Sequence, residues 1–268
     1  MTDNTFKVAA LQMVSTPRVA DNIATAARLV GQAAAQGAKL AVLPEYFGIL
    51  GMRDTDKIDA READGKGPLQ DFLADAAVRH GMWVVGGSVP LECADPGRVL
   101  NTTLVFDDSG RRVARYDKIH LFGFESGKER YRESTTIVPG DQPVAIDTPF
   151  GRLGLSICYD VRFPELYRAL AADIIVVPSA FTATTGRAHW ELLLRARAVE
   201  NLAWVLAAAQ GGVHENGRET FGHSMVIDPW GKVLACQASG EGVVIAEIDP
   251  AYQAKVRASL PALDHRVM

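Results

Sequence analysis

Cysteine is scarce in this sequence. Its 268 residues include three cysteines, Cys93, Cys158 and Cys236, and no two of them form a CxxC pair. An odd, sparse set of this kind argues against a disulfide framework and against a structural zinc site. The six histidines show no HxH or HxxxH spacing, which also disfavours a metal enzyme. We therefore expect a reducing, cytoplasmic location and no bound metal.

Long apolar runs and basic stretches are also missing. The N-terminal segment has no basic part followed by an apolar one, and Gly, Pro or charge interrupts every apolar run well short of about 18 residues. Lys and Arg number 28 against 32 Asp and Glu, a net charge of −4. We expect a soluble protein whose partners include neither nucleic acid nor a membrane. With 48% hydrophobic and 22% charged residues, the composition excludes disorder, collagen and coiled coil.

Short apolar segments rich in β-branched residues alternate with helical patterns, which predicts an α/β fold. Strands are expected at 7–13, 40–43, 83–85, 102–106, 112–116, 153–157, 174–177, 204–209, 224–227, 232–236 and 243–248. Helices are expected at 19–36, 69–80, from Pro164 onward and at 188–201, with a long loop over 122–140. The second half repeats the order of the first without a linker rich in Pro, Gly or Ser. We therefore expect one domain, residues 1–268, with internal pseudo-symmetry.

Cys158 is the first candidate for chemistry. It follows the apolar segment Leu155-Ser156-Ile157 and precedes Pro164, a residue that suits the first turn of a helix. Such a strand-to-helix elbow presents a thiol at the carboxyl end of a strand, and the next backbone N–H groups can receive an oxyanion. Buried packing is the commoner role of a free cysteine, so the elbow by itself leaves both roles open.

Two charged residues lie at the ends of other apolar segments. Glu45 follows Leu43-Pro44, where apolar neighbours would desolvate the carboxylate, raise its pKa and suit it to be a base. Lys118 precedes Ile119-His120 at a strand end, where a fixed ammonium would stabilise negative charge on oxygen and favour a thiolate. Taken singly, the Glu45 carboxylate is better explained as an ordinary strand-end charge.

The order and spacing of these segments are more informative. Glu45, Lys118 and Cys158 resemble the Glu/Lys/Cys triad of the nitrilase superfamily of carbon-nitrogen hydrolases, and the resemblance spans nearly the whole chain. The motifs that carry it are Leu43-Pro44-Glu45, Asp117-Lys118-Ile119-His120-Leu121-Phe122, Glu133-Ser134, Pro139-Gly140, Ile157-Cys158-Tyr159-Asp160, Arg162-Phe163-Pro164-Glu165-Leu166 and Ala188-His189-Trp190-Glu191. Arg195-Ala196-Arg197-Ala198, Ala207-Ala208-Ala209-Gln210 and Gly222-His223-Ser224-Met225 resemble the Nit branch of that superfamily.

This resemblance implies a four-layer α-β-β-α sandwich with the triad at the carboxyl ends of strands. It also implies a homodimer, or a higher homo-oligomer, in which helices pack against each other to give six layers. A second glutamate of the family maps onto Glu133, whose carboxylate would hold the Lys118 ammonium and help to orient the hydrolytic water.

The implied activity is hydrolysis of the terminal amide of a small carboxylate or peptide-like substrate through a thioester on Cys158, with no cofactor. The resemblance of these motifs to the Nit branch favours deaminated glutathione as the substrate. The alternatives are an ω-amidase acting on 2-oxoglutaramate or 2-oxosuccinamate, and a nitrilase acting on a nitrile.

Substrates of this kind carry a carboxylate, so a guanidinium is expected in the pocket. Arg162 and Arg187 are the candidates, although an ion pair of Arg162 with Asp160 or Glu165 is the favoured explanation of that residue. Tyr159 and Phe181 are candidate pocket walls, and core packing explains each of them equally well.

Three alternative interpretations of these residues compete with a carbon-nitrogen hydrolase of the nitrilase type. A cysteine hydrolase of the papain type would need a histidine base, for which His120, His189 and His223 are available. An isochorismatase-type hydrolase would use Asp, Lys and Cys on a single doubly wound sheet. A catalytically silent binding protein on the same scaffold would have no reason to keep Glu45, Lys118, Glu133 and Cys158 together.

Overall fold

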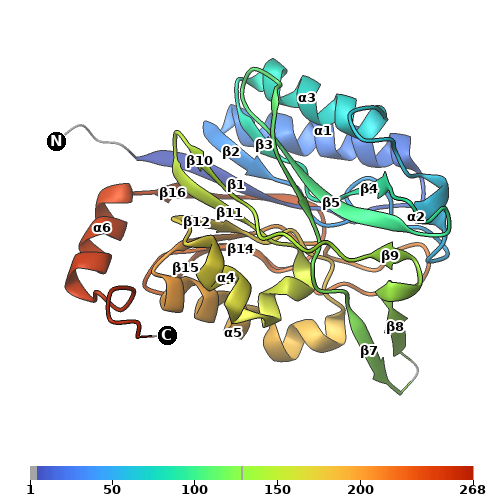
Figure 1. The fold of residues 1–268 in the computed structure, drawn as a ribbon. Coiled ribbons are helices and arrows are strands. Elements are labelled where there is room, and N and C mark those ends of the chain that lie inside the picture. Colours follow the sequence, from blue (N-terminus) through green and yellow to red (C-terminus); the bar gives the residue numbers. More distant parts are fainter. Residues whose placement is uncertain (1–4, 128, 268) are drawn as a thin grey trace.

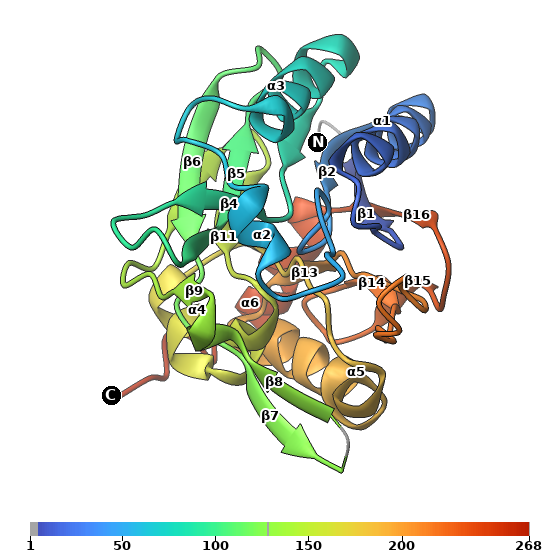
Figure 2. The same cartoon turned by 90° about the vertical axis from the view of Figure 1, so that its right-hand side faces the viewer.

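In the computed structural model, which describes residues 5–127 and 129–267, two β-sheets lie face to face and helices cover their outer faces (Figure 1). Helices α1 and α3 lie over one sheet, and α4 and α5 lie over the other, as the rotated view also shows (Figure 2). The predicted four-layer α-β-β-α sandwich is therefore confirmed.

The first sheet has the strand order β16-β1-β2-β3-β5-β4, and β6 and β9 also pair with β5. Strands β1, β2 and β3 are parallel neighbours, while β16 returns from the end of the chain to pair antiparallel with β1. The bounds are β1 Phe6–Gln12, β2 Ala38–Val42, β3 Trp83–Val85, β4 Val89–Glu92, β5 Val99–Phe106, β6 Arg112–Asp117, β9 Ile137–Val138 and β16 Gly242–Ile248.

The second sheet has the strand order β10-β11-β12-β13-β14-β15, with β11, β12 and β13 parallel at its centre. Its bounds are β10 Ala145–Thr148, β11 Gly151–Leu155, β12 Ile174–Val176, β13 Trp204–Ala207, β14 Ser224–Ile227 and β15 Val233–Gln237. The helices are α1 Val19–Ala35, α2 Asp56–Asp59, α3 Pro68–His80, α4 Pro164–Leu170, α5 Ala183–Asn201 and α6 Pro250–Ser259. Among the described residues, none of these helices is long and apolar enough to cross a membrane.

The central strands are apolar on both faces because each face packs against another layer. Successive side chains of β1 alternate between two cores: Val8 and Ala10 face the second sheet, whereas Ala9 and Leu11 face α1 and α3. This double burial explains why the strand segments appear in the sequence as continuous apolar runs.

Two sequence expectations need correction, and one helix was not predicted. Residues 122–140 are not one long loop, because they contain the antiparallel hairpin of β7 (Gly123–Ser126) and β8 (Glu129–Arg132), a short 3₁₀ helix and β9. Helix α5 begins at Ala183, five residues earlier than the predicted start at 188, and the Thr182 hydroxyl caps it by accepting from the Thr185 N–H. Helix α6 was not predicted, although Asp249 caps it and Pro250 opens it.

Candidate active site

The ends of three strands bring the candidate catalytic residues together. Strand β2 ends at Val42, three residues before Glu45, and β6 ends immediately before Lys118. In the second sheet, β11 ends three residues before Cys158. The two sheets thus each contribute part of the site, at the carboxyl ends of their strands as expected.

Lys118 lies at the centre of this cluster and is fully buried. Its Nζ donates to Glu45 Oε1 at 2.8 Å and to both oxygens of Glu133, at 3.0 and 2.8 Å. Asn101 Nδ2 donates to the same Glu45 oxygen at 2.9 Å. The ammonium is therefore fixed between two carboxylates, and its position has little freedom.

The charges of this cluster stabilise one another. Burial works against the charged form of Lys118, but the negative charges of Glu133 and Glu45 outweigh it and raise the pKa of Lys118 above its ordinary value. Burial likewise opposes ionisation of Glu133, yet Lys118 and the backbone N–H of Phe122 bring the pKa of Glu133 below its usual range. Both groups are therefore charged at neutral pH.

Cys158 lies at a strained turn. Its backbone has φ of 52°, a left-handed conformation that non-glycine residues seldom adopt, and it begins the 3₁₀ helix Cys158–Arg162. Burial, and next the charge of Glu45, raise the pKa of the Cys158 thiol well above its ordinary value. The nearby Lys118 opposes this rise but does not cancel it. Lys118 thus acts in the direction that favours a thiolate, while burial and the charge of Glu45 keep the resting thiol protonated.

Asp160 holds the turn in place. Its buried carboxylate accepts hydrogen bonds from Ile157 N at 2.8 Å, Tyr116 Oη at 2.7 Å and His120 N at 3.0 Å. His120 Nδ1 lies 2.8 Å from the same carboxylate. This network ties the Cys158 turn to the end of β6, next to Lys118, and so fixes the distance between the two sheets at the site.

Sequence reasoning missed two residues that contact the cluster. The Tyr46 hydroxyl donates to Glu133 Oε1 at 2.9 Å, and Asn101 reaches Glu45 as described. Tyr46 directly follows the motif residue Glu45, whereas Asn101 lies on β5, far from any motif in the sequence. A third, Arg218, lines the small cavity around Cys158 together with Glu133, Tyr159 and Phe181.

The predicted substrate residues divide into two groups. Tyr159 and Phe181 do line the Cys158 cavity, and the Arg162 guanidinium lies 5.7 and 5.5 Å from their rings. Within the described part of the chain, Arg162 makes no ion pair with Asp160 or Glu165, so that expectation is wrong; its Nη1 lies 3.3 Å from His189 Nδ1. Arg187 is exposed, lies 3.8 Å from Glu219 and lines a different cavity, along α5.

The three histidines that could serve as the base of a papain-type mechanism contact groups other than Cys158. His120 stacks on Phe163 with 3.6 Å between ring centroids and contacts Asp160, while His223 Nδ1 lies 2.8 Å from the Phe221 carbonyl. His189 lies against Arg162. A single doubly wound sheet of the isochorismatase type is excluded by the two sheets.

Gly87 packs closely against the backbone that precedes Glu45. Its φ is +51°, and a Cβ there would lie 2.1 Å from the Pro44 carbonyl oxygen. Gly87→Ala is expected to lower the free energy of unfolding by about 2–4 kcal/mol. It is also expected to lower kcat about 10- to 100-fold, because the backbone before Glu45 must move.

Thermal unfolding and steady-state rates test this expectation. Gly65→Ala is the matched control, because Gly65 has φ of +83° but no heavy atom within 4 Å of its Cβ position. It should cost only about 1 kcal/mol for the backbone conformation. Equal effects of both substitutions would show that the contact with Pro44 is unimportant.

Comparison with known proteins identifies the family of this chain. The family model described as carbon-nitrogen hydrolase matches residues 7–258. A deaminated glutathione amidase of Synechocystis sp. is 44% identical over 269 residues, which cover 98% of each chain. The omega-amidase NIT2-A of Xenopus laevis is 38% identical over 260 residues, 96% of this chain and 93% of that protein.

A solved structure shows the same fold. The crystal structure of Saccharomyces cerevisiae Nit3, described as a member of branch 10 of the nitrilase superfamily, superposes with a TM-score of 0.89 at 32% identity. The match covers 98% of this chain and 97% of that one. The chain belongs to the carbon-nitrogen hydrolase family of the nitrilase superfamily, and is a hydrolase of carbon-nitrogen bonds other than peptide bonds.

Proposed function

We propose that this protein is an amidase that hydrolyses deaminated glutathione through a thioester on Cys158. The observation that carries the proposal is the position of the Lys118 ammonium, which is fixed between Glu45 and Glu133 beside a protonated, buried thiol. A neutral thiol needs a base to become a nucleophile, and Glu45 is the carboxylate whose charge acts most strongly on it. The 44% identical relative named deaminated glutathione amidase supports the choice of substrate.

The reaction follows from these positions. Glu45 accepts the proton of the Cys158 thiol as sulfur attacks the amide carbon, and the oxyanion that forms is stabilised by Lys118 and the Tyr159 N–H. Glu45 then gives the proton to the departing nitrogen, the carbon-nitrogen bond breaks and an acyl thioester remains. Water loses a proton to Glu45 and attacks the thioester, which releases the acid and returns the proton to sulfur. Glu133 holds Lys118 in place throughout.

A panel of substrates tests the assignment. Deaminated glutathione should release cysteinylglycine, whereas 2-oxoglutaramate should release ammonia; free glutamine and a simple nitrile complete the panel. The proposal expects kcat/KM to be at least about tenfold higher for deaminated glutathione than for 2-oxoglutaramate. The reverse order would make the protein an ω-amidase, as in the Xenopus laevis relative, and preference for the nitrile would make it a nitrilase.

We also propose that residues 1–268 form one domain in a reducing, cytoplasmic setting. Strand β16 pairs with β1, so segments far apart in the sequence lie in the same sheet. Cys93, Cys158 and Cys236 are all free thiols, and the mechanism requires Cys158 to stay reduced.

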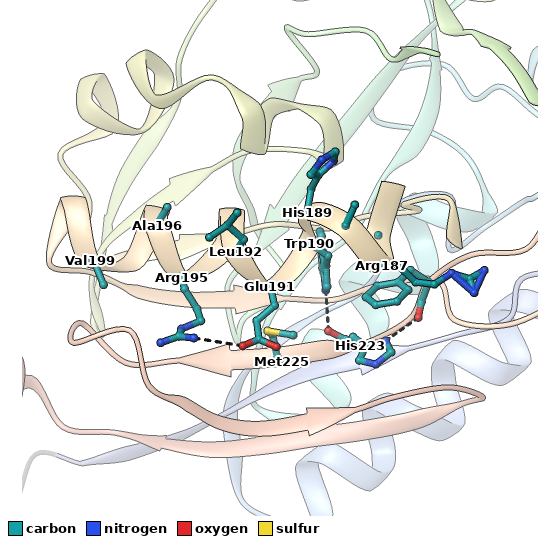
Figure 3. A pocket seen from close by; sticks show the side chains of 13 residues that line it. Arg187, His189, Trp190, Glu191, Leu192, Arg195, Ala196, Val199, His223 and Met225 are labelled. Atoms are coloured by element: carbon teal, nitrogen blue, oxygen red, sulfur yellow. Dashed lines mark hydrogen bonds and ion pairs between the residues drawn. The ribbon is translucent and has the colours of Figure 1, made fainter. Parts of the chain in front are cut away.

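A homodimer through α5 is the assembly that we propose. Leu192 and Val199 on α5, and Trp230 in the β14–β15 turn, are 69%, 45% and 59% exposed. Arg195 Nε donates to the Gly231 carbonyl at 2.8 Å, which joins the helix to that turn. The cavity along this helix has a volume of about 680 Å³. Figure 3 shows Arg195 directed toward Glu191, whose carboxylate lies near Met225. Such an apolar surface with polar side chains around it suits a second copy of the chain.

Leu192→Glu should therefore produce a monomer, with the dimer dissociation constant raised at least about 100-fold because a charge would be buried in the interface. Light scattering coupled to size-exclusion chromatography measures the mass. Val78→Glu places the same charge at a 57% exposed position on α3, in the opposite outer layer, and should leave the dimer intact. A dimer that persists in Leu192→Glu and is lost in Val78→Glu would place the interface elsewhere.

A further inference from the structure

A second cavity lies beside the Cys158 cavity and has no role in the reaction as described. Its volume is about 470 Å³, and it is formed by segments 49–54, 129–131 and 216–219 together with Tyr46 and Lys57. Arg218 lines both this cavity and the small one around Cys158. Its side chain therefore stands where a molecule reacting at Cys158 would extend into the larger space.

Two cations of this cavity lack a carboxylate partner. Within residues 5–127 and 129–267, neither Arg218 nor Lys57 has a carboxylate oxygen within 4.0 Å. Arg53 and Arg130 line the same cavity but pair with Asp56 at 2.9 Å and Glu125 at 3.8 Å. Arg218 and Lys57 thus differ from the other two cations that line the cavity in having no carboxylate partner among the described residues.

The contacts of these two side chains leave hydrogen-bonding capacity unused. Arg218 Nη2 donates to the Ala180 carbonyl at 2.7 Å, and the guanidinium lies 5.1 Å from the Tyr131 ring centre. Its Nε is buried without any hydrogen-bond partner. Lys57 Nζ lies 5.5 Å from the Tyr46 ring centre and has one long hydrogen bond, 3.3 Å, to Thr136 Oγ1. A buried donor left unpaired is costly, so this arrangement favours an anion between them.

Charge in the cavity is consistent with that conclusion. Burial lowers the pKa of Lys57, and the positive charge of Arg218 lowers it further, against the raising effects of Asp54 and Glu133. The carboxylates that line the cavity, Asp54, Glu129 and Glu219, are exposed or half-buried and do not pair with either cation. An added carboxylate would relieve the repulsion between Lys57 and Arg218.

The position of the cavity indicates which half of the substrate it would hold. The departing nitrogen takes its proton from Glu45, and the next residue, Tyr46, forms part of the cavity wall. Arg162, one of the two candidate partners of a substrate carboxylate, lies instead over Tyr159 and Phe181. Because Tyr46 directly follows Glu45, this arrangement assigns the larger cavity to the side from which the amine would leave.

We infer that this cavity is a leaving-group subsite, in which Arg218 and Lys57 bind a carboxylate at the far end of the departing amine. The inference rests on the proposed function and deepens it. It defines the substrate class as secondary amides whose nitrogen bears a short, dipeptide-like chain ending in a carboxylate. Primary amides, which release ammonia, leave this subsite unused.

A pair of substrates that differ only at this carboxylate tests the inference. Deaminated glutathione is compared with its C-terminal carboxamide, which keeps the scissile amide and the acyl half. For the unchanged protein, kcat/KM should be about 10- to 100-fold higher for the carboxylate. In Arg218→Gln, and separately in Lys57→Met, this ratio should fall to within about threefold of one. Arg53→Gln, at a paired cation of the same cavity, should retain the ratio.

The outcomes separate a binding role from a structural one. If either cation only supports the fold, its variant loses rate on both substrates equally and keeps the ratio, which would overturn the inference. If the unchanged protein hydrolyses neither compound, the proposed function has failed. Binding to Cys158→Ala, measured by calorimetry with the same two compounds, then decides the inference alone: tighter binding of the carboxylate form supports it, and equal binding overturns it.

Discussion

Cys158→Ala is expected to lower kcat for amide hydrolysis by at least about 10⁴-fold, with little change in substrate binding. The reason is that sulfur provides the bond to the acyl group, and no neighbouring side chain can replace it. Cys158→Ser should lose nearly as much, since a hydroxyl is a weaker acid than a thiol and Glu45 would have to remove a more tightly held proton. Product release from deaminated glutathione, followed by chromatography, measures the loss.

Cys93→Ala is the matched control for this prediction. Cys93 is a free, half-buried thiol whose Sγ contacts the Asp95 and Arg98 carbonyls, away from the triad. Its variant should keep the full rate. Substantial hydrolysis by Cys158→Ala, with correct folding shown by circular dichroism, would rule out the thioester scheme.

Lys118→Met is expected to affect activity and stability together. Removing the ammonium leaves the Glu45 and Glu133 carboxylates close together without the cation that both contact. Breaking a buried ion pair on one side costs about 3–5 kcal/mol of unfolding free energy. Because the cation that stabilises the oxyanion is also gone, kcat should fall by about 10³-fold or more.

The double variant Lys118→Met/Glu133→Gln separates the two effects. It removes one positive and one negative charge, so the cluster regains its original net charge and should recover most of the lost stability. Activity should stay low, since the oxyanion still lacks its cation. Thermal unfolding and rates of all three proteins check this, and recovery of activity together with stability would show that Lys118 serves the fold alone.

Acidification should act on the same cluster. The pKa of Glu133 is lower in the folded protein than in the unfolded chain, so its ionisation stabilises the fold above the unfolded pKa. This contribution is lost as the pH falls through the lowered, folded pKa. Lys118 also stabilises the fold, but with the opposite pH dependence: because its pKa is raised, its contribution is lost only at strongly alkaline pH.

The core strands and the candidate triad could be predicted from the sequence because their signals are local. Leu40–Leu43 and Leu153–Leu155 are apolar on both faces, and Glu45 and Cys158 follow such runs within a few residues. Strand ends of this kind meet at one edge in any parallel α/β arrangement. The structure brings Glu45, Lys118, Glu133 and Cys158 together as expected, while their catalytic roles stay predictions.

Other features had no local signal. The hairpin β7–β8 has the sequences GFES and ERYR, whose exposed polar residues hide the alternation of a half-buried strand. The start of α5 contains Gly186, which resembles a turn, yet a Cβ there would lie 2.3 Å from Phe221 Cβ, so close packing explains the glycine. Lys57 and Arg218 come from segments far apart in the chain, and only tertiary structure places them in one cavity.

The most direct test of the central claim is detection of the acyl group on Cys158. The protein is mixed with deaminated glutathione, quenched in acid during turnover, digested and analysed by mass spectrometry. The account predicts a 2-oxoglutaryl group on the peptide that contains Cys158, absent from the Cys158→Ala protein and replaced by no other adduct. An acyl group on a different residue, or turnover that continues in Cys158→Ala without any adduct, would contradict it.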